Sequence, residues 1–470
     1  MRNYIQGQAN QIRGSLNQVG GDGNKVQGDG NGILGDKNQV LGGDNKILGG
    51  FNQVSGSSSI VQGSYNTASG SGNQFNGSSN LALGNNNAFW GSQNLAQGNN
   101  NVFAGSKNQA YGDGNKAKGD SNVLNGSSNL AAGDQNQANG NSNAFYGSNN
   151  AAQGSNNVFI GVSNAAQGDS NYINGSSNAF KGNGNVVVGA ENKGEGSLNQ
   201  VAGKGNLLSG DQNKIRGDSN SIKGNLNLVA GNSNLGVVHS SLIKGSNNQA
   251  TGTNLNIAGD HNKVQGTNIL ISGTQNLVSG EANQVRGDGN IVKGNKDYVE
   301  GSQNTVYGQG GNSVFGKLNY VDGSYNFVSG EANKVLNNNN QVLGKANAVS
   351  GIYNQVQGGW NQVVGGGNIV SGNANGVIGF NNGVQGSQNL VGGERNQVIG
   401  GGNFVIGNDN GVKGSVNRVD GFGNLVYGDQ NSVNGGYNRA QGDNNSISGV
   451  GNLVRGSNNI VISTVPTQRH

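Results

Sequence analysis

Polar and apolar residues recur along this chain with a period of seven residues. With glycine as position 1, the frame runs from Gly7 to Gly308, shifts by one residue, and continues from Gly316 to Gly456. Only Val238 and Asn337 replace that glycine. Position 4 is Asn in nearly every heptad, and position 6 is small or apolar. Phase kept over hundreds of residues predicts a repeat architecture.

Each heptad is predicted to be a short strand followed by a corner. Positions 4 and 6 are two residues apart and therefore face the same side of an extended chain, while positions 5 and 7 face the other side. Positions 1 to 3 form the corner, because glycine tolerates positive φ. A strand this short cannot bury its face alone, so successive coils must stack in parallel. The fold class predicted is an all-β parallel β-solenoid.

The number of heptads per coil follows from position 6 between residues 63 and 167. Small and large residues alternate there in two runs, 68–110 and 138–166, and within each run Phe recurs every 14 residues in the same phase. A two-walled β-roll of about 14 residues per coil explains this, because one wall then stacks Phe and the other Ala. Roughly 32 coils at ~4.8 Å each predict a rod on the order of 150 Å long. The apolar core positions predicted are Ala68, Phe75, Ala82, Phe89, Ala96, Phe103, Val321 and Val328.

The Asn at position 4 is predicted to form an inward ladder. Its amide can satisfy backbone groups of the corner and the next Asn along the axis. Representative members are Asn66, Asn73, Asn80, Asn87 and Asn94. The exceptions at this position are Ser59, Ser241, Leu255, Ile269, Asp297 and Gly311.

The repeat predicts one continuous domain over residues 3–462, with a tail at 463–470. The frame is irregular near 235–244, 308–315 and 337–340. These patches are either tolerated bulges or places where the solenoid bends or docks laterally.

Composition and charge argue against several classes of protein. The 470 residues include 90 Gly, one Pro and no Cys, and 31% are hydrophobic, which without periodicity would indicate disorder. The net charge of +4 is spread without a basic run, which argues against nucleic-acid binding. No stretch approaches the roughly 18 apolar residues of a membrane span. An export leader is not evident, so export is leaderless or a leader was left out of this sequence.

Catalytic, cofactor and metal sites are not predicted. His239, His261 and His470 are scattered without metal-ligand spacing. Asp follows the frame glycine in several heptads, as at Asp22, Asp29 and Asp36. We interpret these side chains as hydrogen-bond acceptors in the corner rather than as calcium ligands.

Two kinds of surface residue are candidates for contact or modification. Trp90 and Trp360 fall on outward or corner positions and could contact a partner or stack on a carbohydrate. Possible glycosylation sites are Asn76, Asn125 and Asn174, on outward position 7, and Asn444, in a corner.

The heptads resemble a known repeat. Gly56-Ser-Ser-Ser-Ile-Val-Gln and Gly63-Ser-Tyr-Asn-Thr-Ala-Ser are similar to the Gly-x-x-Ser-x-Ala-x repeat in the head domains of trimeric autotransporter adhesins. The resemblance implies a β-roll with two heptads per coil in a trimeric surface adhesin. This chain departs from that family because Asn replaces Ser, and neither a coiled-coil stalk nor membrane-anchor strands follow.

The function favoured by the sequence is a structural, non-enzymatic protein that self-associates head-to-tail or laterally into an extracellular filament. The alternative is a cell-surface or phage-type adhesin that binds matrix or glycan. An ice-binding solenoid ranks third, because outward Thr arrays are absent and Thr is rare.

Overall fold

Every element of the part of the chain that the structure describes is a β-strand. The structure, a computed structural model, describes residues 2–239, 242–244, 248–273 and 275–463. These residues contain no helix that is long and apolar enough to cross a membrane. The chain divides into two compact units, Met1–Ser233 (unit 1) and Asn234–His470 (unit 2). The all-β prediction is confirmed.

In unit 1 a strand begins in every heptad and covers positions 5 to 7. The strands run from β1 (Tyr4–Gln6) to β33 (Leu228–Ala230), and most have three residues. Four of them extend through the glycine to position 2: β23 (Val158–Val162), β25 (Tyr172–Ser176), β27 (Val186–Ala190) and β29 (Gln200–Lys204).

Unit 2 keeps the same spacing from β34 (Leu235–His239) to β44 (Thr305–Tyr307), and then from β45 (Ser313–Lys317) to β66 (Ile460–Ile462). One strand, β38, is limited to Gly266–Thr267. Five-residue strands here are β34, β36 (Gln249–Thr253), β40 (Leu277–Glu281), β43 (Tyr298–Ser302), β45, β47 (Phe327–Glu331), β49 (Gln341–Lys345), β50 (Ala348–Ile352), β51 (Gln355–Gly359), β52 (Gln362–Gly366), β54 (Gly376–Phe380), β56 (Leu390–Glu394), β60 (Arg418–Phe422), β62 (Ser432–Gly436) and β64 (Ser446–Val450).

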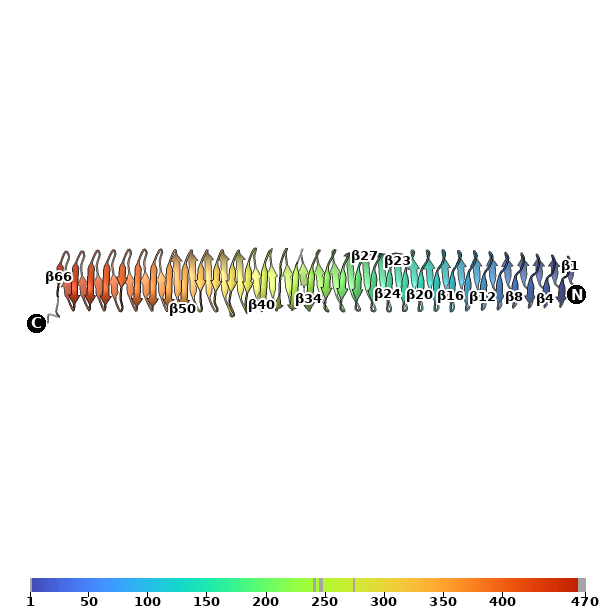
Figure 1. Cartoon of the computed structure of the whole chain (residues 1–470), viewed down its shortest axis with the longest axis horizontal. Coiled ribbons are helices and arrows are strands. Elements are labelled where there is room, and N and C mark those ends of the chain that lie inside the picture. Colours follow the sequence, from blue (N-terminus) through green and yellow to red (C-terminus); the bar gives the residue numbers. More distant parts are fainter. Residues whose placement is uncertain (1, 240–241, 245–247, 274, 464–470) are drawn as a thin grey trace. The chain divides into compact units, whose positions relative to one another are not determined.

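Each unit contains two parallel sheets, one from each wall of the coil. Odd-numbered strands form sheet A and even-numbered strands form sheet B, so strands two apart in sequence lie side by side (Figure 1). Within unit 1, Phe75 of β11 (Gln74–Asn76) lies beside Phe89 of β13 (Ala88–Trp90), two heptads later. The predicted coil of two heptads is therefore confirmed.

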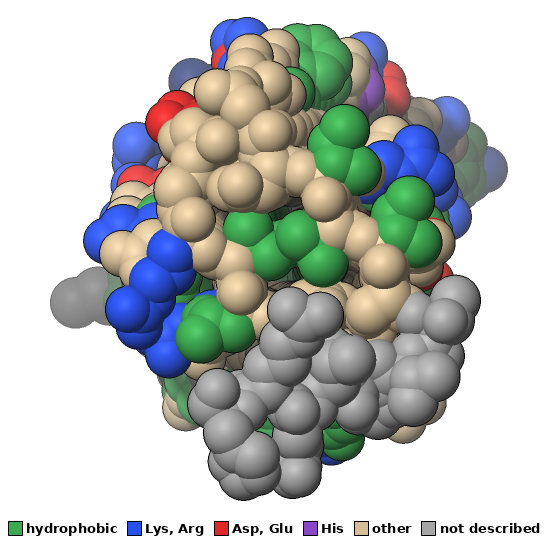
Figure 2. All heavy atoms as spheres, turned by 90° about the vertical axis from the view of Figure 1, so that its left-hand side faces the viewer, with side chains coloured by type: hydrophobic (Ala, Val, Ile, Leu, Met, Phe, Trp, Pro, Cys, Tyr) green, Lys and Arg blue, Asp and Glu red, His purple; other side chains and the backbone are tan. Residues whose placement is uncertain are grey.

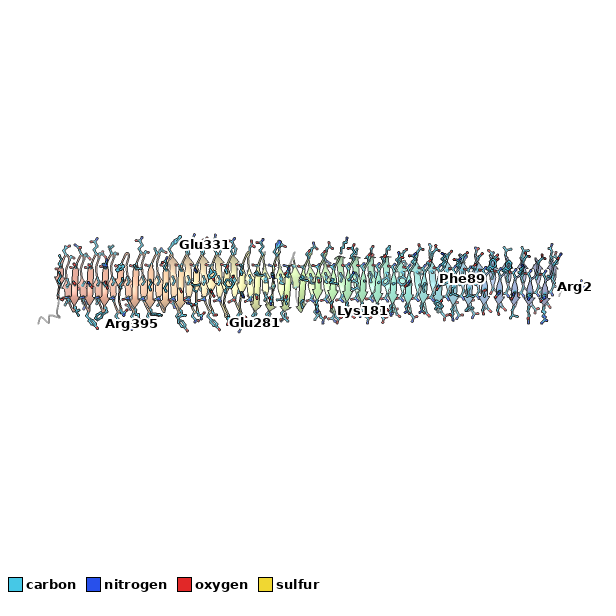
Figure 3. All side chains as sticks on the ribbon, viewed as in Figure 1. Arg2, Phe89, Lys181, Glu281, Glu331 and Arg395 are labelled. Carbon is cyan, nitrogen blue, oxygen red and sulfur yellow. The ribbon has the colours of Figure 1, made fainter. Side chains whose placement is uncertain are left out.

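The core lies between the two walls. Phe75, Phe89 and Phe103 stack on sheet A with ring centroids 5.0 and 4.9 Å apart and interplanar angles of 5° and 7°. Ala68 and Ala82 lie opposite on sheet B. All the predicted apolar positions, from Ala68 to Val328, are buried. Figure 3 shows Phe89 within a coil of unit 1, and Arg395 and Glu331 at the margins of coils of unit 2. The end view in Figure 2 shows hydrophobic side chains at the centre.

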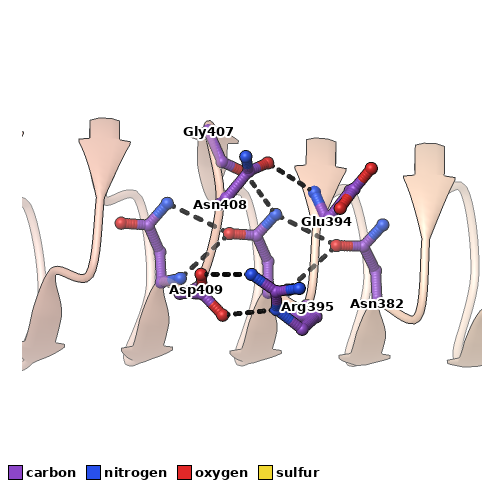
Figure 4. A network of polar contacts seen from close by, with 8 residues as sticks. Asn382, Glu394, Arg395, Gly407, Asn408 and Asp409 are labelled. Atoms are coloured by element: carbon purple, nitrogen blue, oxygen red, sulfur yellow. Dashed lines mark hydrogen bonds and ion pairs between the residues drawn. The ribbon is translucent and has the colours of Figure 1, made fainter.

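The inward Asn side chains form the predicted ladder, shown in Figure 4. Asn396 donates its backbone N–H and its Nδ2–H to Asn382 Oδ1, both at 3.0 Å, and a second Nδ2–H to the carbonyl of Gly407 at 2.7 Å. Asn396 Oδ1 accepts the same pair of bonds from Asn410. The amide thus uses its full hydrogen-bonding capacity, which explains why a polar side chain can be buried at every coil. Asn66, Asn80, Asn87 and Asn94 are buried and make the same ladder bond to the preceding Asn. Asn73 is also buried, but Ser59 precedes it in the ladder, and its Nδ2 donates to the carbonyls of Gly70 and Gly84 instead.

The corner contains a feature that the sequence did not predict. Besides the frame glycine, the residue at position 3 adopts positive φ even when it is bulky, as in Leu16 (φ 63°), Tyr65 (φ 62°) and Trp360 (φ 62°). Its N–H donates to a carbonyl of the preceding coil, for example Tyr65 N to Gly50 O at 3.1 Å. Stacking therefore imposes a left-handed conformation that isolated non-glycine residues avoid.

The irregular patches have different structures. Tyr298 pairs with Ser313, so the coil near 308–315 has one residue more than the others. Asn337 takes the place of the frame glycine with φ 69°. Within 235–244, Ser240 and Ser241 lie outside the described residues, as do residues 464–470 of the predicted tail. The single-domain assignment over 3–462 stays a prediction.

Candidate functional site

The outward surfaces of the sheets are the places where this fold can meet a partner. Positions 5 and 7 project from each strand at intervals of one coil, and both are exposed or half-buried. The walls beneath are held by backbone bonds and the Asn ladder. The side chains at these positions therefore form a rigid, repeating array for any partner that binds there.

Sheet B of unit 1 has an uncharged face from β6 (Gln39–Leu41) to β24 (Ala165–Gln167). This stretch of ten strands, which we call the uncharged face, spans roughly 40 Å at ~4.8 Å per strand. Its outward residues are Gln39, Leu41, Gln53, Ser55, Thr67, Ser69, Leu81, Leu83, Leu95, Gln97, Gln109, Tyr111, Val123, Asn125, Gln137, Asn139, Ala151, Gln153, Ala165 and Gln167. Sheet A of the same coils carries Lys46, Lys116 and Lys118, so the two faces differ in charge.

A shallow groove begins within the uncharged face and continues beyond it. It has a volume of about 1080 Å³ and extends from β18 (Val123–Asn125) to β32 (Ser221–Lys223). Small residues at position 5, including Ala151 and Ala165, make its floor, and the amides of Gln153 and Gln167 stand along it. Toward β32 it acquires charge, where Lys181 Nζ lies 3.2 Å from Glu195 Oε1.

The corners are stabilised by a second row of side-chain acceptors. Asp22 Oδ1 accepts the backbone N–H of Gln8 at 2.6 Å, and Asp36 Oδ1 accepts that of Asp22 at 2.7 Å. Asp29 does the same for Ser15. These carboxylates therefore act as the corner acceptors that the sequence predicted. Among the described residues, His, Cys, Asp and Glu side chains do not gather in groups of three that could hold a metal ion.

Charged side chains pair along the corners of unit 2. Glu331 lies 3.3 Å from both Lys317 and Lys345, and their hydrogen bonds lower the pKa of its carboxyl. The Arg395 guanidinium bonds both carboxylate oxygens of Asp409, at 2.7 and 2.8 Å, and lowers the pKa of that carboxyl (Figure 4). Asp409 is exposed and Glu331 is half-buried at the surface, which indicates surface pairing rather than a reactive site.

The predicted contact and modification sites are accessible but scattered. Trp90, 49% exposed, projects from sheet A of unit 1, whereas Trp360, 69% exposed, stands in a corner of unit 2. The sequon residues Asn76, Asn125 and Asn444 are exposed and Asn174 is half-buried. Whether they are glycosylated stays a prediction. His261 is an exposed corner residue, and His470 lies outside the described residues.

The repeat has a match among protein families. The model described as the grass antifreeze beta roll matches residues 5–105, 195–287, 236–316, 282–372 and 310–407, which together make up more than half of the chain. The chain belongs to the grass antifreeze β-roll family. No curated protein matches the chain.

Membership of the grass antifreeze family changes one interpretation of the sequence. It supports the β-roll repeat, but not the resemblance to adhesin head domains. The physical reason is that any two-walled roll needs a corner glycine and an inward group that bonds the corner. The heptad therefore identifies the fold better than the family. The uncharged face was not predicted from the sequence. Its residues come from every second heptad, so they form a continuous row only when the two walls are considered separately.

Proposed function

We propose that this chain binds ice, and that the uncharged face of unit 1 is the contact surface. The observation that carries the proposal is the family match over residues 5–105, which includes the uncharged face from Gln39 to Gln97. The family is named for antifreeze function, and we extend that function to this chain.

The geometry supports the proposal in two ways. Ice presents water oxygens at fixed, repeating positions, so a protein surface that contacts many of them needs its own fixed repeat. Strands ~4.8 Å apart supply one, and the ladder prevents them from moving independently. The face also lacks Lys and Arg, whose ammonium and guanidinium groups hold water in geometries of their own.

The side chains of the uncharged face differ from a Thr array. Only Thr67 represents that residue on it, and amides, Ser and aliphatic side chains make up most of the rest. The low rank given to ice binding from the sequence rested on the absence of Thr. We infer that the rows of amide and aliphatic side chains make the contact with ice in place of Thr. The aliphatic groups reduce competition from bulk water for this surface.

The test compares lysine substitutions on the two walls. Leu83→Lys with Gln97→Lys places charges on the uncharged face, while Gln62→Lys with Asn76→Lys places them at the same position 7 on sheet A. We expect the sheet B pair to weaken inhibition of ice recrystallisation, and binding of labelled protein to a single ice crystal, by at least ten-fold, with the sheet A pair unaffected. Wild-type protein that neither binds ice nor slows recrystallisation would refute the function; equal losses in both pairs would refute the face.

A second candidate, lateral self-association, is favoured by an apolar stripe on sheet B of unit 2. Val364, Ile378, Phe380, Leu390 and Ile406 are all large and exposed there. Contiguous exposed apolar surface of this kind commonly marks an interaction site. If Ile378→Lys leaves the mass measured by light scattering at high concentration equal to that of the wild type, the stripe does not mediate association.

The remaining functional inferences stay predictions. They are head-to-tail filament assembly, adhesion to matrix or glycan, an extracellular or cell-surface location, the absence of nucleic-acid partners and the absence of catalysis. Solid-phase binding to matrix proteins and glycans separates an adhesin from an ice-binding protein, because the latter should give no signal there.

A further inference from the structure

Asp297 is the one ionisable side chain that is fully buried in the described part of the chain, with 1% of its surface exposed. It occupies position 4, where the ladder otherwise has Asn. Its Oδ1 behaves as an Asn oxygen does and accepts the backbone N–H and the Nδ2–H of Asn312, both at 3.0 Å. Its backbone N–H donates to Asn283 Oδ1 at 3.2 Å. Its Oδ2, in contrast, has no hydrogen-bond partner among the described residues.

That oxygen replaces the nitrogen of the usual amide. Elsewhere Nδ2 donates to the carbonyl of the frame glycine one coil further on, as Asn283 does to Gly294 at 3.1 Å. The glycine that corresponds to Asp297 is Gly308. A carboxylic acid can donate its O–H to this carbonyl, whereas a carboxylate can only repel it. Burial raises the pKa of the Asp297 carboxyl to about 6, against the opposing effect of the two bonds from Asn312.

The coil around Asp297 is also the one with an extra residue. Asp297 and Asn312 are 15 residues apart, and the insertion lies between Gly308 and Asn312. Charged side chains do not share the interior with Asp297. Those on the coils packed against it are exposed: Glu281, Arg286, Asp288, Lys293, Lys296, Glu300, Lys317 and Asp322.

We propose that Asp297 is an acid–base switch in the Asn ladder. The coil that carries the insertion is closed when the Asp297 carboxyl is protonated and opens when that carboxyl ionises. The protonated form restores the bond to Gly308 O and makes the ladder continuous. The ionised form leaves a buried charge beside a carbonyl oxygen, in the coil with the least regular backbone. The switch does not depend on ice binding.

The direction of the pH dependence follows from the two states. The closed coil keeps the proton up to about pH 6, whereas the opened coil releases it near the ordinary value of 3.8. Stability is therefore highest below about pH 4, falls as the pH rises to about 6, and is constant above that. A difference of about two pKa units corresponds to a roughly 100-fold change in the opening equilibrium.

Hydrogen–deuterium exchange of the full chain, corrected for intrinsic rates, tests the switch at pH 4 and pH 7. Protection of peptides between Asp297 and Asn312 should fall roughly 100-fold in the wild type and not at all in Asp297→Asn. The matched control is Asn396→Asp in a different coil, where the Asn396 amide makes the equivalent bonds to Asn382 and Gly407. Peptides between residues 396 and 410 should acquire the same pH response in this variant. An unchanged wild-type coil, a response retained in Asp297→Asn, or a folded Asn396→Asp without any response at its own coil would each overturn the proposal.

Discussion

Removing one rung of the Asn ladder should destabilise the solenoid far more than removing an outward side chain of the same heptad. Asn94 is a suitable rung in unit 1. Its Nδ2 donates to Asn80 Oδ1 at 3.1 Å and to Gly105 O at 2.9 Å. Its Oδ1 accepts the backbone N–H of Asn108 at 3.0 Å and that residue's Nδ2–H at 3.2 Å. Asn94→Ala deletes all four bonds.

The magnitude follows from the groups left behind. The carbonyl of Gly105 and the backbone N–H of Asn108 both lose the partner that Asn94 supplied. A buried backbone group without a partner costs about 1–3 kcal/mol, so two of them predict a loss of roughly 2–6 kcal/mol in the free energy of opening at this coil. Asn108 Nδ2 keeps its bond to Gly119 O and adds little.

The assay is hydrogen–deuterium exchange of peptides around Asn108, since a long repeat array need not unfold in one step. Faster exchange confined to the coils next to residue 94, together with a lower thermal midpoint, is expected for Asn94→Ala. The control is Gln97→Ala at exposed position 7 of the same heptad, which should change exchange very little. Equal effects of the two substitutions would refute the claim that the buried amides hold the corners.

Three further outcomes follow from the same coils. Ser59→Asn should stabilise unit 1 by about 1–3 kcal/mol, because Ser59 Oγ is buried without a partner in the described part of the chain and an Asn would restore the missing rung; an unchanged thermal midpoint would contradict this. Phe89→Ala removes the middle ring of the stack and should cost about 3–5 kcal/mol by denaturant unfolding, and no loss would mean that the walls collapse to fill the cavity. Gly91→Ala should prevent correct stacking, because its Cβ would overlap the carbonyl oxygen of Gly105; circular dichroism equal to that of the wild type would exclude this.

The sequence by itself determined the coil. Gly at position 1, Asn at position 4 and an apolar residue at position 6 recur because each coil repeats the same corner and the same inward face. The alternation of Ala68, Phe75, Ala82 and Phe89 even fixed the number of walls, since Phe can stack only at intervals of one full coil. These are local and nearest-neighbour constraints, and they are visible in the linear pattern.

The tertiary structure showed which outward residues share a face, and it alone decided what the exceptions do. Leu83 and Gln97 share a face although they belong to successive coils, while Lys46 lies on the other wall; no local preference encodes this charge difference. The left-handed conformation of Tyr65 contradicts its intrinsic preference, because bonds to the preceding coil impose it. The place of Asp297 in the ladder could be read from the frame. Its unpartnered oxygen and raised pKa depend on the packing of the coils around it.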